Sequence, residues 1–208
     1  MFVKICGITR LEDADAAVAA GADALGFVFW PKSPRFVDPE FAREISAGVP
    51  EAVRLIGVFV DQPAGQVNEI AERVGLTDVQ LHGDESLEYV RQMARRVVKA
   101  VPMAPDATPV LQRWPDDVTV LLDVHDPVRK GGTGKIIDWV AASRMAKERQ
   151  VILAGGLTPE NVGDAISRVR PWGIDVSSGV ETSPGIKDPM RLKALFEAVH
   201  GSHDTTRS

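Results

Sequence analysis

Several features on which whole classes of protein depend are scarce in this sequence. It contains one cysteine, Cys6, which cannot form an internal disulfide and which fits a reducing compartment. No apolar run is long enough to cross a bilayer, and the first residues lack the charged-then-apolar order of a signal peptide. We therefore expect a soluble, cytoplasmic protein without a membrane partner.

Clustered positive charge is also missing. The 208 residues carry a formal net charge of −5 and no basic run, which argues against nucleic acid as a partner. The four histidines are His82, His125, His200 and His203, and their spacing matches no metal site. No bound metal is therefore expected.

Apolar residues make up 44% of the chain, which is enough for one sizeable core. Eight apolar runs are each followed by a helical pattern, and most are continuous, as in parallel strands that are buried on both faces. The pairs Asp38-Pro39, Thr158-Pro159 and Asp188-Pro189 each predict a helix start. The predicted strands are Val3–Cys6, Ala24–Phe29, Leu55–Val60, Val79–Leu81, Val97–Val101, Val118–Asp123, Val151–Ala154 and Ile174–Ser177.

This pattern predicts the α/β class and a single (β/α)8 TIM barrel over residues 1–200, followed by a polar tail at residues 201–208. At about 26 residues per unit, the barrel would be of near-minimal length. The alternative is a doubly wound open sheet, which usually has about five or six parallel strands. No linker interrupts the series, so one domain is expected.

Active sites of such barrels lie at the carboxyl ends of the strands. The polar residues and glycines at the predicted ends include a thiol, carboxylates, an imidazole and two small-residue loops, which together suit an acid/base enzyme with an anion site. They are Cys6, Asp61, His82, Asp123, Gly155-Gly156 and Ser177-Ser178-Gly179.

Cys6 ends the first predicted strand, and alternation along a strand puts Lys4 on the same side. An ammonium group near a thiol favours the thiolate, the form that acts as base or nucleophile. Gly7 allows a sharp turn, and Thr9 with Glu12 matches a capping box that would open the next helix. The alternative is an inert, packed cysteine.

Asp123 follows a strongly apolar strand, where a carboxyl group tends to keep its proton and can serve as a general acid. It could instead cap the next turn. His82 could be a metal ligand or a proton carrier, although the spacing of the histidines matches no metal site. For Asp84 and Glu85 we favour a role at a helix start, where acidic side chains complement the helix dipole.

Two adjacent loops suit a phosphate group. Gly155-Gly156 and Ser177-Ser178-Gly179 follow the last two predicted strands, where barrels often bind phosphate, and a short helix near Gly179 would point its positive end at the anion. Glycines that only make turns are the alternative. Arg35, in the loop after the second strand, suits a second anion such as a carboxylate, although a solvated basic loop is equally consistent.

The segment Gly131–Lys135 fails the Walker pattern, because Ile136 follows the lysine and Arg129 stands where the first glycine is needed. It is interpreted either as a lid over the site or as a plain surface loop.

Taken together, these motifs resemble the phosphoribosylanthranilate isomerase family of tryptophan biosynthesis. The resemblance runs in order along most of the chain, and the whole set is far more specific than any one member. The segments that carry it are Lys4–Thr9, Gly26–Arg35, Val79–Gly83, Gly131–Lys135, Gly155–Val162 and Asp175–Glu181.

The resemblance implies an Amadori rearrangement of a phosphorylated aminoaldose to a ketose, with Asp123 as general acid and Cys6 as general base. It implies that Arg35 holds the anthranilate carboxylate and that the two small-residue loops hold the phosphate. His82 and Asp175 join the substrate-binding residues on the same grounds. No cofactor is implied, since the substrate nitrogen serves as electron sink, and the chain would be a monomer or a homodimer.

The chain departs from the family pattern at Ile136-Ile137 and at Val124–Asp126, which puts loop details in doubt. Two alternatives stay open. One is another barrel isomerase acting on a phosphosugar, although a bifunctional enzyme would need a second glycine-rich loop, which Phe59–Ala64 lacks. The other is a non-catalytic barrel that binds a phosphorylated metabolite.

Overall fold

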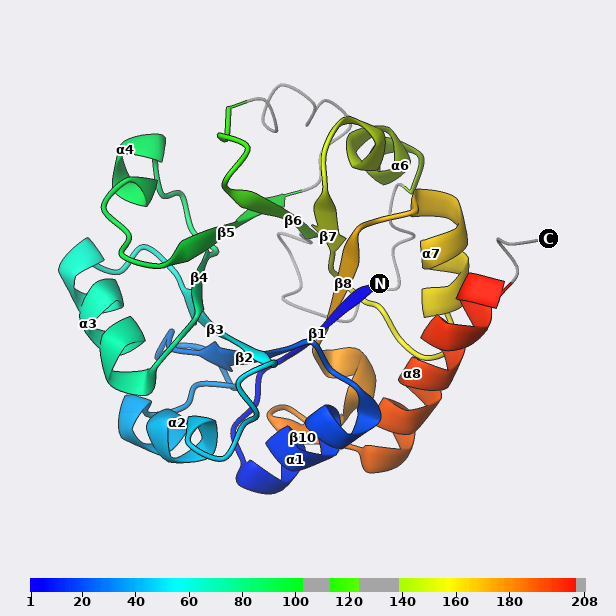
Figure 1. Cartoon of the computed structure of the whole chain (residues 1–208), viewed down its shortest axis with the longest axis horizontal. Coiled ribbons are helices and arrows are strands. Elements are labelled where there is room, and N and C mark those ends of the chain that lie inside the picture. Colours follow the sequence, from blue (N-terminus) through cyan, green and yellow to red (C-terminus); the bar gives the residue numbers. More distant parts are fainter. Residues whose placement is uncertain (103–112, 124–138, 205–208) are drawn as a thin grey trace.

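A computed structural model describes residues 1–102, 113–123 and 139–204 of the chain. Eight parallel strands form a closed barrel in which each strand pairs with its neighbours in sequence and β8 pairs with β1 (Figure 1). The predicted (β/α)8 barrel is therefore confirmed. The strands are β1 (Phe2–Cys6), β2 (Ala24–Val28), β3 (Arg54–Phe59), β4 (Asp78–Leu81), β5 (Arg96–Pro102), β6 (Thr119–Asp123), β7 (Val151–Leu153) and β8 (Gly173–Val176).

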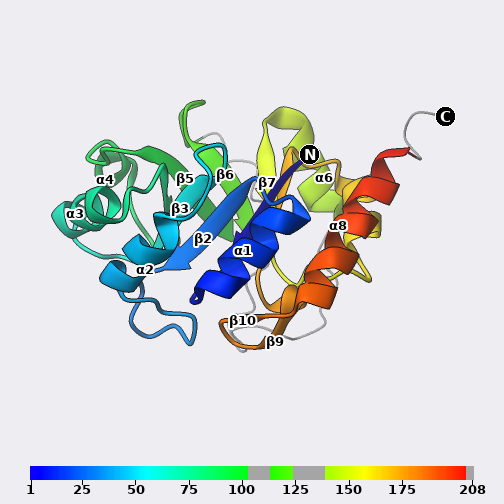
Figure 2. The ribbon, with the colours of Figure 1, turned by 60° about the horizontal axis from the view of Figure 1, so that its bottom comes forward.

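Helices surround the barrel and cover its outer face (Figure 1). They are α1 (Leu11–Ala20), α2 (Pro39–Ser46), α3 (Ala64–Val74), α4 (Leu87–Val90), α6 (Trp139–Glu148), α7 (Val162–Val169) and α8 (Pro189–Asp204). A short 3-10 helix, η1 (Ser178–Val180), and an antiparallel pair, β9 (Glu181–Ser183) and β10 (Ile186–Lys187), lie between β8 and α8. In Figure 2 this pair lies at the opposite end of the barrel from the N-terminus.

The proline pairs predict two helix starts correctly. Asp38 caps α2 by accepting a hydrogen bond from the Glu40 N–H at 2.9 Å, and Asp188 accepts one from the Met190 N–H at 2.8 Å at the start of α8. The third prediction is wrong, because α7 begins at Val162. There Asn161 accepts a hydrogen bond from the Thr158 N–H and thereby closes a turn ahead of the helix.

The predicted capping box is also wrong. Helix α1 begins at Leu11, and its N-cap residue, Arg10, makes no capping hydrogen bond through its side chain. The Thr9 hydroxyl instead donates to the Gly185 carbonyl at 2.5 Å. This contact joins the first loop to the β9–β10 turn across the carboxyl end of the barrel.

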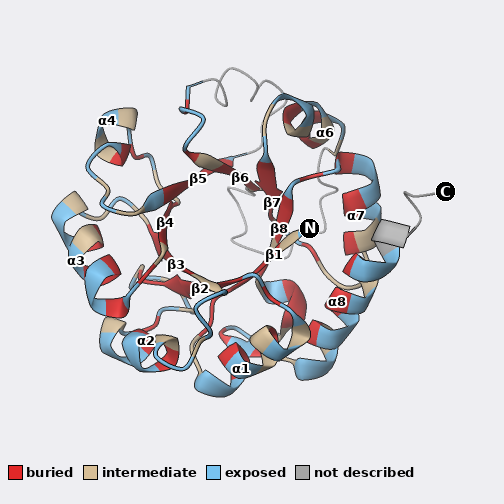
Figure 3. Cartoon of the chain, viewed as in Figure 1, coloured by how far each residue is buried: buried red, intermediate tan, exposed pale blue. Residues whose placement is uncertain are grey.

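Two apolar layers follow from the alternation along each strand. The larger layer lies between strands and helices and contains outward residues such as Val3, Ile5 and Val79 (Figure 3). A smaller cluster fills the barrel interior and consists of Val98, Ala100, Leu121, Ile152 and Ala154. Polar side chains on inward positions therefore stand out as candidates for chemistry.

The end of the chain is more regular than expected. Helix α8 continues to Asp204, so residues 201–204 of the segment expected as a tail belong to it, and residues 205–208 lie outside the described part. Among the described helices, none combines the length and the apolar character needed to span a bilayer.

Candidate functional site

The polar residues singled out from the sequence lie at one end of the barrel. Cys6 ends β1 and Asp123 ends β6, whereas His82, Gly155 and Ser177 follow β4, β7 and β8. Because all eight strands are parallel, these positions share the carboxyl face. Segment Gly131–Lys135 and His125 lie outside the described residues.

Cys6 is 8% exposed and points inward beside Lys4. A Cβ atom built at the facing Gly26 would lie 2.9 Å from both the Cys6 Sγ and the Lys4 Nζ. Only a glycine leaves room for these two groups to lie so close together. Burial raises the pKa of the Cys6 thiol. The nearby Lys4 lowers this pKa, but by less, so the net shift is upward.

Lys4 is fully buried and forms an ion pair with Asp175, with 2.9 Å between Nζ and Oδ1. Burial lowers the pKa of Lys4, but Asp175 and the neighbouring Cys6 raise it more, and the net shift is upward. Lys4 therefore stays charged at neutral pH, buried beside Cys6. Asp175, expected among the substrate-binding residues, is the partner that keeps this cation charged.

A second buried lysine, Lys187, contacts the backbone of the cysteine, and burial lowers its pKa although Glu181 raises it. Its ammonium donates to the Cys6 carbonyl at 2.6 Å and to Glu181 Oε1 at 2.7 Å. Glu181 also accepts from Arg35, whose Nε donates to Oε1 at 2.9 Å and to Oε2 at 3.1 Å and whose Nη2 donates to Oε2 at 2.6 Å. Burial raises the pKa of Glu181, but Arg35 and Lys187 lower it further, so its carboxylate stays ionised.

Arg35 makes the two-pronged contact expected of it, but with a carboxylate of the chain itself. Its aliphatic part packs over Gly7, where an added Cβ would lie 2.6 Å from Arg35 Cδ and 3.2 Å from Ser177 Oγ. Arg35, Gly7 and Ser177 thus lie together. Lys187 was missed from the sequence, because a lone lysine after the eight predicted strands carries no signal of burial.

His82 and Asp123 contact one another, with 3.0 Å between Nε2 and Oδ2. The other ring nitrogen, Nδ1, lies 3.0 Å from Nε2 of Gln80, an inward residue of β4 that is 1% exposed. The imidazole and the carboxylate are each partly open to solvent, with 34% and 25% of their side chains exposed. An imidazole and a carboxylate are therefore joined at the carboxyl face.

The interpretation of Asp84 and Glu85 as helix-start residues is wrong for Glu85. Helix α4 begins two residues later and is capped by Ser86, whose hydroxyl accepts a hydrogen bond from the Tyr89 N–H. Glu85 is buried and pairs with Lys99 at 2.8 Å. It also accepts the Asp61 N–H at 3.0 Å, so it ties the loops after β3 and β4 together.

The two loops expected to hold phosphate are shaped by glycines. Gly155 and Gly156 have φ angles of 94° and 65°, which favour glycine, and no described atom outside their chain neighbours lies within 4 Å of a Cβ built at Gly156. A Cβ at Gly179 would lie 1.8 Å from the Leu157 carbonyl oxygen. The loops after β7 and β8 therefore pack directly against each other, with open space beside Gly156.

Comparison with known proteins identifies the family. A model of N-(5'-phosphoribosyl)anthranilate (PRA) isomerase matches residues 3–198. The chain belongs to this family. PRA isomerases are enzymes of tryptophan biosynthesis that isomerise a phosphoribosyl compound, and the resemblance drawn from the sequence is confirmed.

Individual PRA isomerases are similar over nearly their full length. The PRA isomerase of Geotalea uraniireducens is 48% identical over 200 residues, covering 96% of this chain and 98% of that one. The enzyme of Geobacter sulfurreducens is 46% identical over 199 residues, with 96% and 98% covered. The crystal structure of the Thermotoga maritima enzyme superimposes with a TM-score of 0.90 at 43% identity, with 97% and 99% covered.

Another solved PRA isomerase is described as a complex with reduced 1-(o-carboxyphenylamino)-1-deoxyribulose 5-phosphate. It is 42% identical, with a TM-score of 0.86 and 97% and 99% of the two chains covered. Within the described part of the present chain, no group of three or more His, Cys, Asp or Glu side chains could hold a metal ion.

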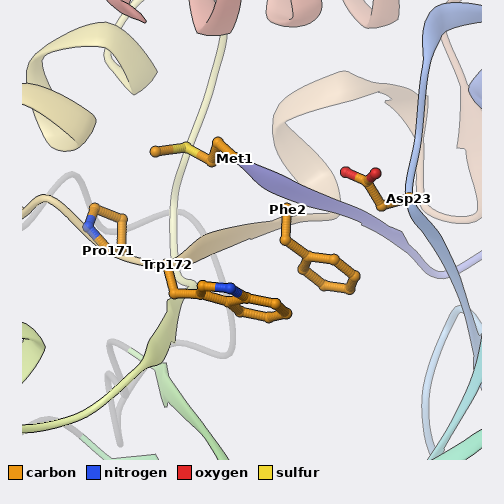
Figure 4. A pocket seen from close by; sticks show the side chains of 5 residues that line it. All are labelled: Met1, Phe2, Asp23, Pro171 and Trp172. Atoms are coloured by element: carbon orange, nitrogen blue, oxygen red, sulfur yellow. The ribbon is translucent and has the colours of Figure 1, made fainter. Parts of the chain in front are cut away.

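A hollow at the other end of the barrel is lined by Met1, Phe2, Asp23, Pro171 and Trp172 (Figure 4). Phe2 opens β1 and Trp172 directly precedes β8, and their rings stack with centroids 4.7 Å apart. This hollow lies at the amino ends of the strands, whereas active sites of such barrels lie at the carboxyl ends.

Proposed function

We propose that the chain converts N-(5'-phosphoribosyl)anthranilate to 1-(2-carboxyphenylamino)-1-deoxyribulose 5-phosphate, with Asp123 as general acid and Cys6 as general base. Family membership supports the reaction. The position of Cys6 and Asp123 at the carboxyl ends of strands on different sides of the ring supports the roles. A substrate lying across the barrel mouth can meet both groups.

In the first step, Asp123 gives its proton to the furanose ring oxygen. The bond between C1 and that oxygen breaks, and the nitrogen lone pair forms a protonated Schiff base at C1. The Cys6 thiolate then takes the proton from C2, and the electrons of that C–H bond form a C1–C2 double bond and neutralise the nitrogen. Loss of the C2 hydroxyl proton and protonation at C1 give the ketose, so atoms and electrons balance.

Lys4 has a specific task in this scheme. The pKa of Cys6 is raised by burial, and a thiol cannot take the C2 proton. A fixed cation beside the sulfur favours the thiolate at the moment when it is needed. Asp175, proposed from the family resemblance as a substrate contact, supports the base through its ion pair with Lys4.

The substrate carries a phosphate at one end and a carboxylate at the other, so it needs two anion-binding sites. We assign the phosphate to backbone N–H groups and hydroxyls of Gly155, Gly156, Ser177, Ser178 and Gly179, supported by the open space beside Gly156. We assign the anthranilate carboxylate to Arg35, whose guanidinium is held at the rim by Glu181. His82 contacts the substrate beside Asp123.

No metal or organic cofactor enters this scheme, because the substrate nitrogen accepts the electrons. A cytoplasmic location is proposed from the single cysteine and the biosynthetic role. The chain would act as a monomer or a homodimer; one Thermotoga maritima relative is described as dimeric. Light scattering of the purified protein distinguishes the two states.

The test is a fluorescence-monitored assay of the purified chain with freshly made phosphoribosylanthranilate. We expect multiple turnovers per site and a product that matches the ketose standard. The competing assignment is a barrel isomerase for a different phosphosugar, such as the aminoaldose of histidine biosynthesis. Turnover of that compound alone, with none of the anthranilate derivative, would reject the proposed function.

A further inference from the structure

A buried glutamine lies behind the imidazole that contacts the proposed acid. Gln80 is 1% exposed on the inward side of β4, and its Nε2 lies 3.0 Å from His82 Nδ1. Within the described part of the chain, its Oε1 is buried without a hydrogen-bond partner. An apolar side chain would fill an interior position without leaving a polar atom unpaired, so the glutamine calls for a specific reason.

The donor and acceptor roles of the two His82 nitrogens depend on the tautomer, and an ionised Asp123 selects one tautomer. An ionised carboxylate only accepts, so the His82 nitrogen that lies 3.0 Å from Asp123 Oδ2 carries a hydrogen. In a neutral imidazole the other nitrogen, Nδ1, then has a lone pair and needs a donor. The Gln80 amide supplies it. The chain of donors therefore runs from Gln80 to His82 to Asp123.

This direction decides where an added proton can go. A proton on Nδ1 would face the N–H group of Gln80, and two donors would meet at 3.0 Å. A proton on Asp123 meets no such conflict, because Oδ2 keeps its bond from His82 and Oδ1 can carry the hydrogen. Gln80 thus disfavours the imidazolium form of His82, so an added proton binds to the Asp123 carboxylate instead.

We infer that Gln80 is a positioning residue that holds His82 in the Nε2–H tautomer, so that the proton bound by the His82–Asp123 pair resides on Asp123. This inference rests on the proposed function for its consequence, because Asp123 must be protonated to open the furanose ring. The tautomer itself does not depend on any reaction.

Other charged groups near His82 are already paired. The Asp61 carboxylate packs against Gly83 and accepts the Asp84 N–H, and Glu85 forms an ion pair with Lys99. The Lys99 ammonium also donates to the Gly83 carbonyl at 2.6 Å. These contacts hold the loop that carries His82 in place. Among the described contacts, only Gln80 lies against the Nδ1 atom of His82.

The experiment measures the protonation of both His82 nitrogens by nitrogen-15 NMR of histidine-labelled protein between about pH 6 and 8, the range in which an ordinary histidine titrates. The His82→Asn variant assigns the signals. For the natural chain we expect hydrogen on Nε2 and none on Nδ1 throughout. A protonated Nδ1 in the natural chain would overturn the inference.

Two variants test whether Gln80 is the cause of this tautomer. In Gln80→Met, which keeps the length and removes the donor, Nδ1 should become protonated within this range, and kcat should fall about tenfold or more with little change in KM. In Gln80→Glu, an acceptor faces Nδ1, so both nitrogens should carry hydrogen at neutral pH and the loss of kcat should be larger. Gln92→Met is the control, because Gln92 is an exposed glutamine whose side chain donates to the Glu88 carbonyl and, among the described residues, makes no other hydrogen bond.

Unchanged His82 signals in both Gln80 variants would also overturn the inference. Melting curves check that each variant is folded, and Gln80→Met replaces a buried polar group with an apolar one, which the interior tolerates. Failure of the proposed function has a different signature: full turnover by Asp123→Asn with the wild-type tautomer of His82 intact.

Discussion

The ammonium group of Lys4 lies 2.9 Å from the Asp175 carboxylate and next to the Cys6 thiol, inside the barrel at its carboxyl end. Burial raises the pKa of Cys6, whereas Lys4 lowers it, so the lysine limits the shift. The reactivity of the proposed base therefore depends on a buried neighbour whose raised pKa favours its charged form.

Alkylation of the single cysteine can measure this dependence. The rate should rise with pH around a midpoint above that of a free thiol, because burial raises the pKa of Cys6. Lys4→Met removes the opposing charge, so the midpoint should move higher and the rate at neutral pH should fall. The exposed Lys193, paired with Glu197, offers the control Lys193→Met with an unchanged midpoint. An unchanged or lower midpoint in Lys4→Met would refute the role of Lys4.

Arg35→Met should raise the KM for phosphoribosylanthranilate about 10- to 100-fold, the size expected for a lost charge-assisted hydrogen-bond pair. The affinity for inorganic phosphate, measured as competitive inhibition, should change little. Arg43→Met removes an exposed arginine from α2 and should change neither value. If both affinities fell together in Arg35→Met, Arg35 would belong to the phosphate grip.

Alanine at Gly179 and at Gly156 should distinguish the packing of the two loops from the space they leave for the phosphate. Gly179→Ala places a Cβ against the Leu157 carbonyl, so the loops after β7 and β8 must move, and both phosphate affinity and the melting temperature should fall. Gly156→Ala meets no described atom, so it should cost the fold only the strain of a positive φ, about 1–2 kcal/mol, but its Cβ occupies the space proposed for the phosphate and should lower phosphate affinity. Gly201→Ala, in α8, is a control with free space around it. Normal phosphate affinity in Gly179→Ala would reject the proposed grip.

The Lys99–Glu85 pair should contribute to stability rather than to chemistry. Both side chains are buried, so Lys99→Met should lower the free energy of unfolding by about 3–5 kcal/mol, and Lys99→Met/Glu85→Gln should recover part of the loss. Denaturant titrations measure both. An undiminished unfolding free energy in Lys99→Met would contradict the prediction.

The same pair predicts a pH dependence. Burial raises the pKa of Glu85, but Lys99 and two backbone N–H groups lower it further, and the net shift is downward. Its stabilisation is therefore complete above the unfolded pKa of about 4.3 and disappears as pH falls through the lower folded pKa. Glu85→Gln should flatten this part of the stability curve. A curve identical to that of the natural chain would show that Glu85 does not contribute.

The barrel and the ends of its strands could be read from the sequence because continuous apolar runs and the period of two are local properties. Cys6, His82 and Asp123 follow from the fold rule alone. The Arg35–Glu181–Lys187 chain could not be found this way. Arg35 and Glu181 are 146 residues apart, and Glu181 and Lys187 lie in β9 and β10, outside the eight barrel strands. The role of Glu85 also depended on Lys99, which a helix-start pattern cannot reveal.

The central claim is that Cys6 and Asp123 perform the chemistry of a bound substrate, and one comparison tests it most directly. Turnover of phosphoribosylanthranilate and binding of the reduced ketose phosphate are measured for the natural chain, Cys6→Ala and Asp123→Asn. We predict that each variant loses at least about 100-fold in kcat, the lower range for a positioned acid or base, while binding stays within a few-fold. Near-normal turnover by either variant would contradict the account.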